Sequence, residues 1–381
     1  MLSLLAILQA AALVLLIVRL LPGRRRLAPV APYRDDRQVG RISIIVATYN
    51  EARRIAPCLE GLVRQGPVVR EILVVDSAST DGTVELVQAA TARDSRIRLL
   101  RDDPLPEGWV GKVWALQHGL HHATSEWVLG IDADTEPHPD LAGGALAAAE
   151  THHYDVASFA PRFDIRDTAE RWLQPALLVT LIYRFGAAGT DSRGERVMAN
   201  GQCFLARRAA LLDVDGYSSA RDSFCDDVTL ARNMARAGYR VGFLDGSRLY
   251  DVRSYNSARE AWREWGRSLD LKDASSRFRQ WFDVLFLLIA QGTPVPALIG
   301  MAIWVGLAGA SALASAMPAL ATSGLLLVTR VLLQFALAPS YRERGVAFWL
   351  SPLADPLAAV RILVSTMRTP AEWRGRRFVR R

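Results

Sequence analysis

Two aspartates that follow an apolar run are the residues of this sequence best placed to do chemistry. Trp127–Ile131 has the composition of a buried strand, and Asp132 and Asp134 follow it with one residue between them. Because side chains alternate along a strand, residues two apart project to the same side, roughly 6–7 Å from each other. Two such carboxylates repel each other unless a cation or hydrogen-bond donors lie between them, and Mg²⁺ and Mn²⁺ prefer oxygen ligands. A pair of this kind alone is more often a loop feature, so its meaning depends on other motifs.

Two further polar clusters follow predicted strands upstream. The run Ser43–Ala47 leads into Thr48-Tyr49-Asn50-Glu51, and the run Glu71–Val75 leads into a polar stretch from Asp76 to Thr83. Each cluster taken singly is typical of a strand exit, a turn or a helix cap. In open α/β sheets, however, ligands bind beyond the carboxyl ends of the strands, where the strand order reverses. Three acidic clusters at three strand ends therefore predict one shared binding crevice.

The elements that must position these clusters alternate between strand and helix. From residue 41 to about residue 255, short apolar strands are separated by helix-like stretches, which is typical of a mostly parallel sheet with helices on both faces. The fold class is therefore α/β. We expect strands at 43–47, 71–75, 97–100, 127–131 and 155–159, connected by helices at 53–65, 83–92, 111–123 and 139–150.

Apolar runs on both sides of this domain predict membrane segments. Leu2 to Leu21 is long enough to cross a hydrocarbon core of ~30 Å as a helix. Arg24, Arg25 and Arg26 follow it, which is the reverse of the charge order in a signal peptide and places the next domain in the cytoplasm. The alternative, that the apolar runs are buried core helices of a soluble protein, is harder to reconcile with their length and with the basic end of the chain.

The expected organisation follows from these runs. It comprises a transmembrane helix at 1–22, a basic linker at 23–40, a cytoplasmic α/β domain at 41–255, an amphipathic interfacial region at 256–283, transmembrane helices at 284–317 and 318–338, a re-entrant or interfacial segment at 345–367 and a basic cytoplasmic tail at 368–381. The segment 345–367 is not assigned as a span because a fourth crossing would export the arginine-rich tail.

Composition narrows the class of partner. The 381 residues include 46 basic and 39 acidic side chains, a net charge of +7. Such a surplus suits nucleic acid or anionic lipid, and the apolar runs favour lipid, so no nucleic-acid partner is expected. Cys58, Cys203 and Cys225 are too few and too scattered for a disulfide framework or a four-cysteine zinc site, which indicates a reducing compartment.

The ordered set of strand-end clusters resembles the donor-binding motifs of family 2 glycosyltransferases. The resemblance extends over roughly residues 41–250. It implies the GT-A fold, a Rossmann-like mostly parallel sheet, and inverting transfer from a nucleotide-diphosphate sugar. It also implies that Thr48, Glu51 and Asp76 hold the nucleoside, that Asp132 lies at the ribose and diphosphate, and that Asp134 binds a divalent cation, Mg²⁺ or Mn²⁺.

A second pair of aspartates is a candidate for acid–base chemistry. Asp226 and Asp227 open a predicted helix that runs to Ala237 and stops at Gly238. A carboxylate in the first turn is stabilised in its charged form by the helix dipole, as suits a base that takes the proton of an acceptor hydroxyl. This segment resembles the acceptor half of the family, which implies that Asp227 is the catalytic base. Capping of the helix is the alternative for both, and for Asp226 alone it is preferred.

Lys112 is the remaining candidate. It follows Gly108 and Gly111 in a segment that is not a P-loop, because the glycine spacing is wrong and no Ser or Thr comes next. The segment resembles a Gly-Lys stretch of membrane-bound family members, which implies that the ammonium meets the diphosphate of the donor. A solvated lysine at a helix start is the alternative.

Taken together, these motifs predict a membrane-bound, metal-dependent, inverting hexosyl- or deoxyhexosyltransferase on the cytoplasmic side of a bacterial inner membrane. Its partners would be a nucleotide-diphosphate sugar and a lipophilic acceptor in the bilayer. The glycine–lysine segment and the basic end also resemble bacterial transferases of carotenoid and hopanoid pathways, which favours a hydroxylated carotenoid. A polyprenyl phosphate, a glycerolipid or a catalytically silent scaffold are the alternatives. A dinucleotide-dependent oxidoreductase is disfavoured because no G-x-G-x-x-G follows the first strand.

Overall fold

The computed structural model describes residues 2–253, 255, 257–268, 271, 274–367, 372–373 and 376–377. The chain divides into two compact units. One, here called the sheet unit, comprises residues 26–164, 188–253 and 371–381. The other, here called the helical unit, comprises residues 1–25, 165–187 and 254–370. The segment 165–187 thus groups with the apolar helices, although it lies within the expected range of the α/β domain.

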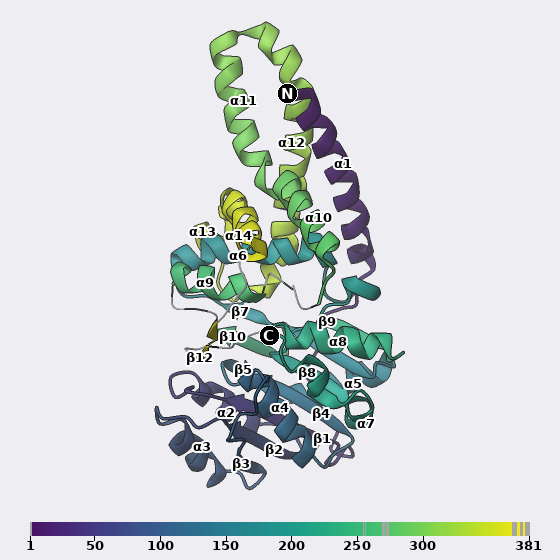
Figure 1. Cartoon of the computed structure of the whole chain (residues 1–381), viewed down its shortest axis with the longest axis vertical. Helices are drawn as coiled ribbons and strands as arrows, with labels where there is room; N and C mark the ends of the chain where they lie inside the picture. Colours follow the sequence, from purple (N-terminus) through teal and green to yellow (C-terminus); the bar gives the residue numbers. More distant parts are fainter. Residues whose placement is uncertain are drawn as a thin grey trace. The chain divides into compact units, whose positions relative to one another are not determined.

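The sheet unit is built around a seven-stranded mixed sheet (Figure 1). Its strands, in spatial order, are β3 (Ile97–Arg101), β2 (Val69–Asp76), β1 (Ile42–Thr48), β4 (Trp127–Asp132), β8 (Cys203–Arg207), β6 (Val156–Ala160) and β9 (Val241–Asp245). The first four are parallel, β8 is antiparallel to both of its neighbours, and β9 is parallel to β6. The predicted α/β fold with a mostly parallel sheet is confirmed.

Both faces of this sheet are covered, which explains the nearly continuous apolar strands. In β1, Ile44 and Val46 belong to one hydrophobic core and Ile45 to the other, as alternation along a strand requires. The helices of this unit are α2 (Ile55–Val63), α3 (Thr83–Thr91), α4 (Gly111–His122), α5 (Leu141–Thr151), α7 (Arg208–Asp213) and α8 (Asp226–Arg236). A small second sheet has the order β5 (Thr135–Pro137), β10 (Tyr250–Arg253) and β7 (Arg162–Asp164).

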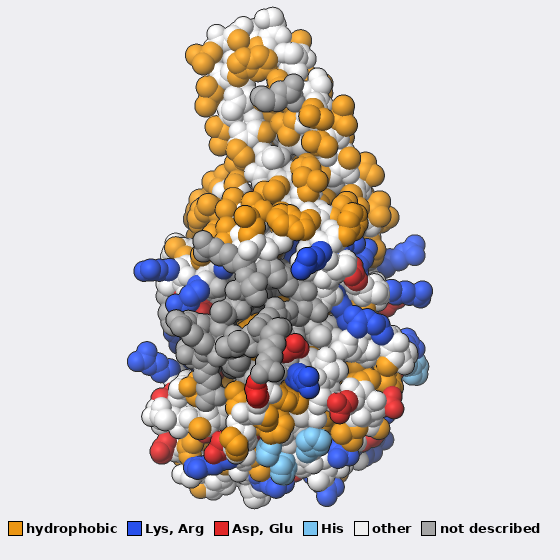
Figure 2. Space-filling model, in the orientation of Figure 1, with side chains coloured by type: hydrophobic (Ala, Val, Ile, Leu, Met, Phe, Trp, Pro, Cys, Tyr) orange, Lys and Arg blue, Asp and Glu red, His pale blue; other side chains and the backbone are white. Residues whose placement is uncertain are grey.

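The helical unit contains α1 (Leu2–Leu20), α6 (Thr168–Phe185), α9 (Ala258–Ser268), α10 (Arg277–Leu287), α11 (Pro294–Ala308), α12 (Ala310–Leu337), α13 (Gly345–Trp349) and α14 (Asp355–Met367). Within the described residues, two helices are long and apolar enough to cross a membrane, Leu2–Arg25 and Ser311–Ser340. A third candidate is the pair Arg277–Gly292 and Pro294–Ala308, which is bent by 45°. Figure 2 shows apolar side chains over the surface of α1, α11 and α12.

One helix boundary differs from the expected one. The sequence predicted a division between residues 317 and 318, whereas the structure breaks the chain at Gly309 and carries Pro318 inside α12. Gly309 has a φ of +80°, which a residue without a side chain adopts at little cost. The segment 345–367 forms the short helices α13 and α14. Of the expected tail 368–381, only 372–373 and 376–377, the strands β11 (Glu372–Trp373) and β12 (Arg376–Arg377), lie within the described residues.

Candidate active site

The carboxyl ends of β1 and β2 bring Thr48 and Asp76 together. The two residues are in register across the parallel pair, and both side chains are buried. The Thr48 hydroxyl donates a hydrogen bond to Oδ1 of Asp76 over 3.2 Å, and the backbone N–H of Ser79 donates to Oδ2 over 3.0 Å. Asp76 is therefore fixed at the edge of the sheet where ligands bind in α/β folds.

The loops that follow β1 and β2 hold each other. Asn50, with a φ of 54°, accepts a hydrogen bond from the backbone N–H of Thr80 over 2.9 Å. The N–H of Asn50 donates to the Ser79 hydroxyl over 2.9 Å, and the N–H of Glu51 donates to the Thr83 hydroxyl over 2.8 Å. Glu51 is buried in this arrangement. Thr48, Glu51 and Asp76, the three residues expected to contact the nucleoside, thus lie together at this edge of the sheet and form one wall of the candidate site.

A cavity beside this wall adds residues that sequence reasoning missed. The Ser77 hydroxyl donates a hydrogen bond to Oδ2 of Asp102 over 2.8 Å, and burial raises the pKa of Asp102. Asp102 comes directly after β3, which is therefore a fourth strand with an acidic residue at its carboxyl end, a signal present in the sequence. The cavity is lined by Ser77, Ala78, Asp102, Asp103 and Leu105.

Lys112, in the first turn of α4, lies at the end of β4. Its Nζ is 2.7 Å from Oδ1 of Asp132. Burial alone would lower the pKa of Lys112, but the carboxylates of Asp132, Asp226 and Asp227 raise it above its ordinary value. The ammonium is therefore charged and lies among carboxylates from both β4 and α8.

Asp134 lies beyond Asp132 in a half-buried position. Its Oδ2 is 4.0 Å from Nη1 of Arg54. Burial, followed by the neighbouring Asp132 carboxylate, raises the pKa of Asp134. No group of three or more His, Cys, Asp or Glu side chains in the described part of the chain is arranged to hold a metal ion. A cation here would need oxygen ligands from a bound molecule or from water in addition to carboxylate.

Asp227 is held rigidly at the start of α8. The backbone N–H of Gly201 donates to its Oδ2 over 2.7 Å, and the N–H of Val228 donates to its Oδ1 over 2.8 Å. Burial raises the pKa of Asp227 despite the opposing ammonium of Lys112. A methyl group on Gly201 would lie 3.2 Å from Nζ of Lys112 and 3.3 Å from Cβ of Asp227. Glycine at this position therefore allows the lysine and the aspartate to approach each other.

The preferred interpretation of Asp226 as a helix cap is wrong. The residue at the N-cap of α8 is Cys225, and its side chain makes no capping hydrogen bond. Asp226 is the first helical residue, and burial raises its pKa. It lines a small cavity together with Leu116, Gly130, Gly201, Phe204, Tyr217, Asp227 and Leu230. Asp226 thus lines this cavity from the first helical position, and Cys225 occupies the N-cap position.

Comparison with known proteins identifies the class of this domain. Residues 43–214 match the sequence model of glycosyl transferase family 2. An uncharacterized glycosyltransferase YibD of Escherichia coli is 28% identical over 132 residues, covering 35% of this chain and 37% of that protein. YaiP of the same organism is 28% identical over 239 residues, covering 61% of this chain and 57% of the relative. The chain thus spans between a third and three fifths of the lengths of these two relatives.

Two further proteins resemble longer stretches. A 4,4'-diaponeurosporenoate glycosyltransferase of Staphylococcus haemolyticus is 23% identical over 262 residues, covering 68% of each chain. The mannosyltransferase PcManGT from Pyrobaculum calidifontis, solved with GDP-Man and Mn²⁺, aligns with 96% of this chain and 99% of its own, at 22% identity and a TM-score of 0.57. The fold is therefore the GT-A fold. Residues 43–214 form a family 2 glycosyltransferase domain.

Proposed function

We propose that this protein is a membrane-bound inverting glycosyltransferase, which moves a sugar from a nucleotide-diphosphate sugar to a hydroxyl of a lipophilic acceptor. The observation that carries the proposal is the arrangement around Lys112. The half-buried ammonium of Lys112 lies 2.7 Å from Asp132, where a leaving diphosphate would need positive charge. Next to it, Asp227 is a fixed carboxylate that can accept a proton.

The donor would occupy the carboxyl edge of the sheet. Thr48, Glu51 and Asp76 would hold the nucleoside, since they form one buried wall there. The cavity lined by Ser77 and Asp102 offers room next to that wall for the nucleobase of the donor. Asp132 would lie at the ribose and diphosphate, and Lys112 would meet the diphosphate oxygens. GDP-Man, which is bound in the structure of the similar PcManGT, is a donor of this chemical class.

The residues present fit a divalent cation at Asp134. Its half-buried carboxylate is repelled by Asp132, and a cation between them would relieve this repulsion. Mg²⁺ and Mn²⁺ are commonly bound by one or two carboxylates, with the remaining ligands supplied by phosphate and water. When bound, such an ion supplies positive charge to the leaving diphosphate. PcManGT was solved with Mn²⁺ as well as GDP-Man.

The chain's own residues would then carry out a single displacement. Asp227 takes the proton of the acceptor hydroxyl, and the freed oxygen attacks the anomeric carbon while the bond from that carbon to the diphosphate oxygen breaks. Lys112 stabilises the negative charge that develops on the leaving diphosphate. Because attack and departure take place on opposite faces of the sugar, the anomeric configuration inverts.

A hydroxylated carotenoid is the acceptor we favour. Two helices of the described chain are long and apolar enough to span a bilayer, so an acceptor that stays in the membrane could be reached without extraction. The relative from Staphylococcus haemolyticus, which matches over 68% of its length, is a 4,4'-diaponeurosporenoate glycosyltransferase; this supports a carotenoid acceptor, although its substrate is a carboxylate. We place the catalytic domain on the cytoplasmic side of a bacterial inner membrane, where nucleotide sugars are made.

Mass spectrometry of lipids and pigments from cells that express the chain tests this function. Cells with the unmutated chain should accumulate a lipid that has gained one sugar, and Asp227→Asn should abolish that product. Asp222→Asn is the matched control, because Asp222 is exposed and lies five residues earlier. A glycosylated polyprenyl phosphate or glycerolipid would replace the carotenoid as acceptor. Equal product from Asp227→Asn would remove Asp227 from the mechanism, and failure to bind any nucleotide sugar would support a silent scaffold.

A further inference from the structure

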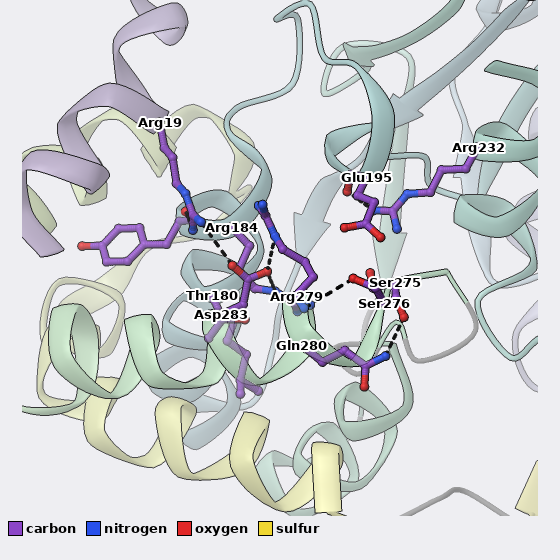
Figure 3. A network of polar contacts seen from close by, with 12 residues as sticks. Arg19, Thr180, Arg184, Glu195, Arg232, Ser275, Ser276, Arg279, Gln280 and Asp283 are labelled. Carbon is purple, nitrogen blue, oxygen red and sulfur yellow. Dashed lines mark hydrogen bonds and ion pairs between the residues drawn. The ribbon is translucent and has the colours of Figure 1, made fainter. Parts of the chain in front are cut away.

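One group of buried charges in the helical unit is paired internally. Figure 3 shows Arg19, Arg184 and Arg279 pointing toward Asp283. Nη2 of Arg19 is 3.2 Å from Oδ1 of this carboxylate. Nε of Arg184 and Nε of Arg279 are 3.4 and 3.2 Å from Oδ2. This buried arginine cluster joins α1, α6 and α10, and both oxygens of its carboxylate are already used. We therefore interpret it as a structural connection between helices rather than as a ligand site.

Asp102 in the sheet unit differs, because it lines a cavity. The cavity has a volume of about 200 Å³, and the other residues that line it are Ser77, Ala78, Asp103 and Leu105. Asp102 itself is 4% exposed, and its Oδ2 accepts a hydrogen bond from the Ser77 hydroxyl over 2.8 Å. A carboxylate offers about four acceptor positions on its two oxygens. It can therefore accept further hydrogen bonds from a molecule in the cavity.

The backbone of Asp102 is held in place next to the expected nucleoside wall. Nε1 of Trp114 donates a hydrogen bond to the carbonyl oxygen of Asp102 over 2.6 Å. The N–H of Asp102 donates to the carbonyl oxygen of Asp76 over 3.5 Å. Trp114 in turn packs edge-to-face against Trp109, with ring centroids 5.1 Å apart. Because Asp76 belongs to the wall expected to contact the nucleoside, Asp102 lies where the nucleobase of the proposed donor would extend.

The hydrogen-bonding edge of guanine matches a carboxylate better than the edge of any other common base. Guanine carries two adjacent donors, N1–H and the N2 amino group, and the two oxygens of a carboxylate can accept from both. Uracil and thymine present N3–H between two carbonyl oxygens, which a carboxylate repels. Adenine and cytosine present an amino group beside a ring nitrogen that is itself an acceptor. A carboxylate in the base cavity therefore discriminates among nucleobases, because a mismatch leaves a buried acceptor without a donor.

The electrostatics of the cavity favour a ligand that brings donors. Burial raises the pKa of Asp102, and the carboxylates of Asp76 and Asp103 act in the same direction. The hydrogen bond from Ser77 opposes this shift without cancelling it. Two further donors from a ligand would stabilise the charged form, since hydrogen bonds to a carboxylate favour its ionisation.

We propose that Asp102 selects guanine as the nucleobase, so that the donor is a guanosine-diphosphate sugar. N1–H and the N2 amino group of guanine would donate to the two oxygens of Asp102, while Ser77 holds the carboxylate in place. The assignment rests on the proposed function, since it assumes that the cavity takes the nucleobase of the donor. It deepens that function, because the strand-end motifs do not specify the nucleotide.

Isothermal titration calorimetry of the purified full chain in detergent, with Mn²⁺ present, tests this assignment. Guanosine, uridine and xanthosine diphosphates are titrated into the unmutated chain, Asp102→Asn and Asp222→Asn. Asp222 is exposed, so the same chemical change at that position controls for the loss of one charge. The unmutated chain and Asp222→Asn should bind guanosine diphosphate about tenfold or more tightly than uridine diphosphate.

Asp102→Asn should change this preference in a defined way. The amide keeps one acceptor for N1–H but replaces the other with an NH₂ donor. That donor repels the N2 amino group of guanine and matches the carbonyl oxygen that xanthine carries at C2. The variant should therefore lose about tenfold or more in affinity for guanosine diphosphate and gain affinity for xanthosine diphosphate by a similar factor. A merely structural role of Asp102 would produce no such gain.

The outcomes separate this assignment from the proposed function. Equal or tighter binding of uridine diphosphate by the unmutated chain would overturn the guanine assignment alone, and this measurement does not depend on any variant folding. An unchanged preference for guanosine diphosphate in Asp102→Asn would overturn the role of Asp102. Binding of no nucleoside diphosphate by the unmutated chain would instead overturn the proposed function, on which the assignment rests.

Discussion

At the residue scale, the chemistry of the site depends on one positive charge among several carboxylates. Lys112 is 2.7 Å from Asp132, and its pKa is also raised by Asp226 and Asp227. An ammonium that is already held in place needs no rearrangement to stabilise the charge that develops on a leaving diphosphate. The same ammonium opposes the effect of burial on the pKa of the nearby acids, since a neighbouring positive charge favours the carboxylate form. In the proposed mechanism, Lys112 would therefore act on both the donor and the base.

Replacing Lys112 with methionine should lower kcat/KM for sugar transfer by a factor of about 10²–10³, the loss typical of removing one electrostatic stabiliser of the transition state. Steady-state kinetics with varied donor measures it. Lys112→Arg keeps the charge and should lose less. Full activity in Lys112→Met would show that the ammonium is a structural counter-ion of Asp132 only.

The pH dependence of the reaction follows from Asp227. A general base must be deprotonated, and burial raises the pKa of this carboxyl above its ordinary value. The rate should therefore fall as the pH drops through that raised pKa, by about tenfold per pH unit. The acidic limb of the profile of kcat/KM against pH should lie above the ordinary carboxyl range of about 4. A rate that stays constant down to that range would contradict the role of Asp227 as base.

At the element scale, buried ion pairs fix the short C-terminal helices of the helical unit. Arg330 of α12 and Asp355 at the start of α14 are 2.9 Å apart, and their side chains are 2% and 4% exposed. Arg330 also donates to Gln334 and Ser351, and Gln291 donates to Asp355. These bonds attach α14 to α12 and make the segment 345–367 part of the packed helices.

Removing one partner of this pair should lower the free energy of unfolding far more than removing both. Arg330→Met leaves Asp355 buried without its main counter-charge and should destabilise the protein by about 3–5 kcal/mol. The double variant with Asp355→Leu should recover most of that loss, because two apolar side chains need no pairing. Thermal unfolding in detergent compares the variants. A double variant no more stable than Arg330→Met would argue against this ion pair as the cause.

Local sequence patterns predicted the strands and the strand-end residues of the sheet unit well. All five expected strands are present, and the expected helix of Asp226 ends within one residue of α8. What local patterns could not show is strand order: β8 lies antiparallel between β4 and β6, and this depends on non-local pairing. The role of Gly201 is likewise non-local, because it depends on the close approach of Lys112 and Asp227.

At the scale of the whole molecule, the two units divide the proposed task. The sheet unit holds the residues assigned to donor binding and proton transfer. The helical unit holds the candidate spans, the buried arginine cluster and the exposed aromatic side chains of α10. The sequence predicted the apolar runs, but it could not predict that residues 165–187 group with the apolar helices rather than with the sheet. That grouping arises from tertiary contacts of α6, which local hydropathy does not report.

The most direct test of the central claim is transfer by the purified full chain. The protein is incubated with a nucleotide-diphosphate sugar, Mn²⁺ and lipid extract, and the release of nucleoside diphosphate is measured together with the sugar that appears in the lipid fraction. The account predicts equimolar release and transfer with the unmutated chain and with Asp222→Asn, and neither with Asp227→Asn. Release and transfer at an unchanged rate in Asp227→Asn would contradict it.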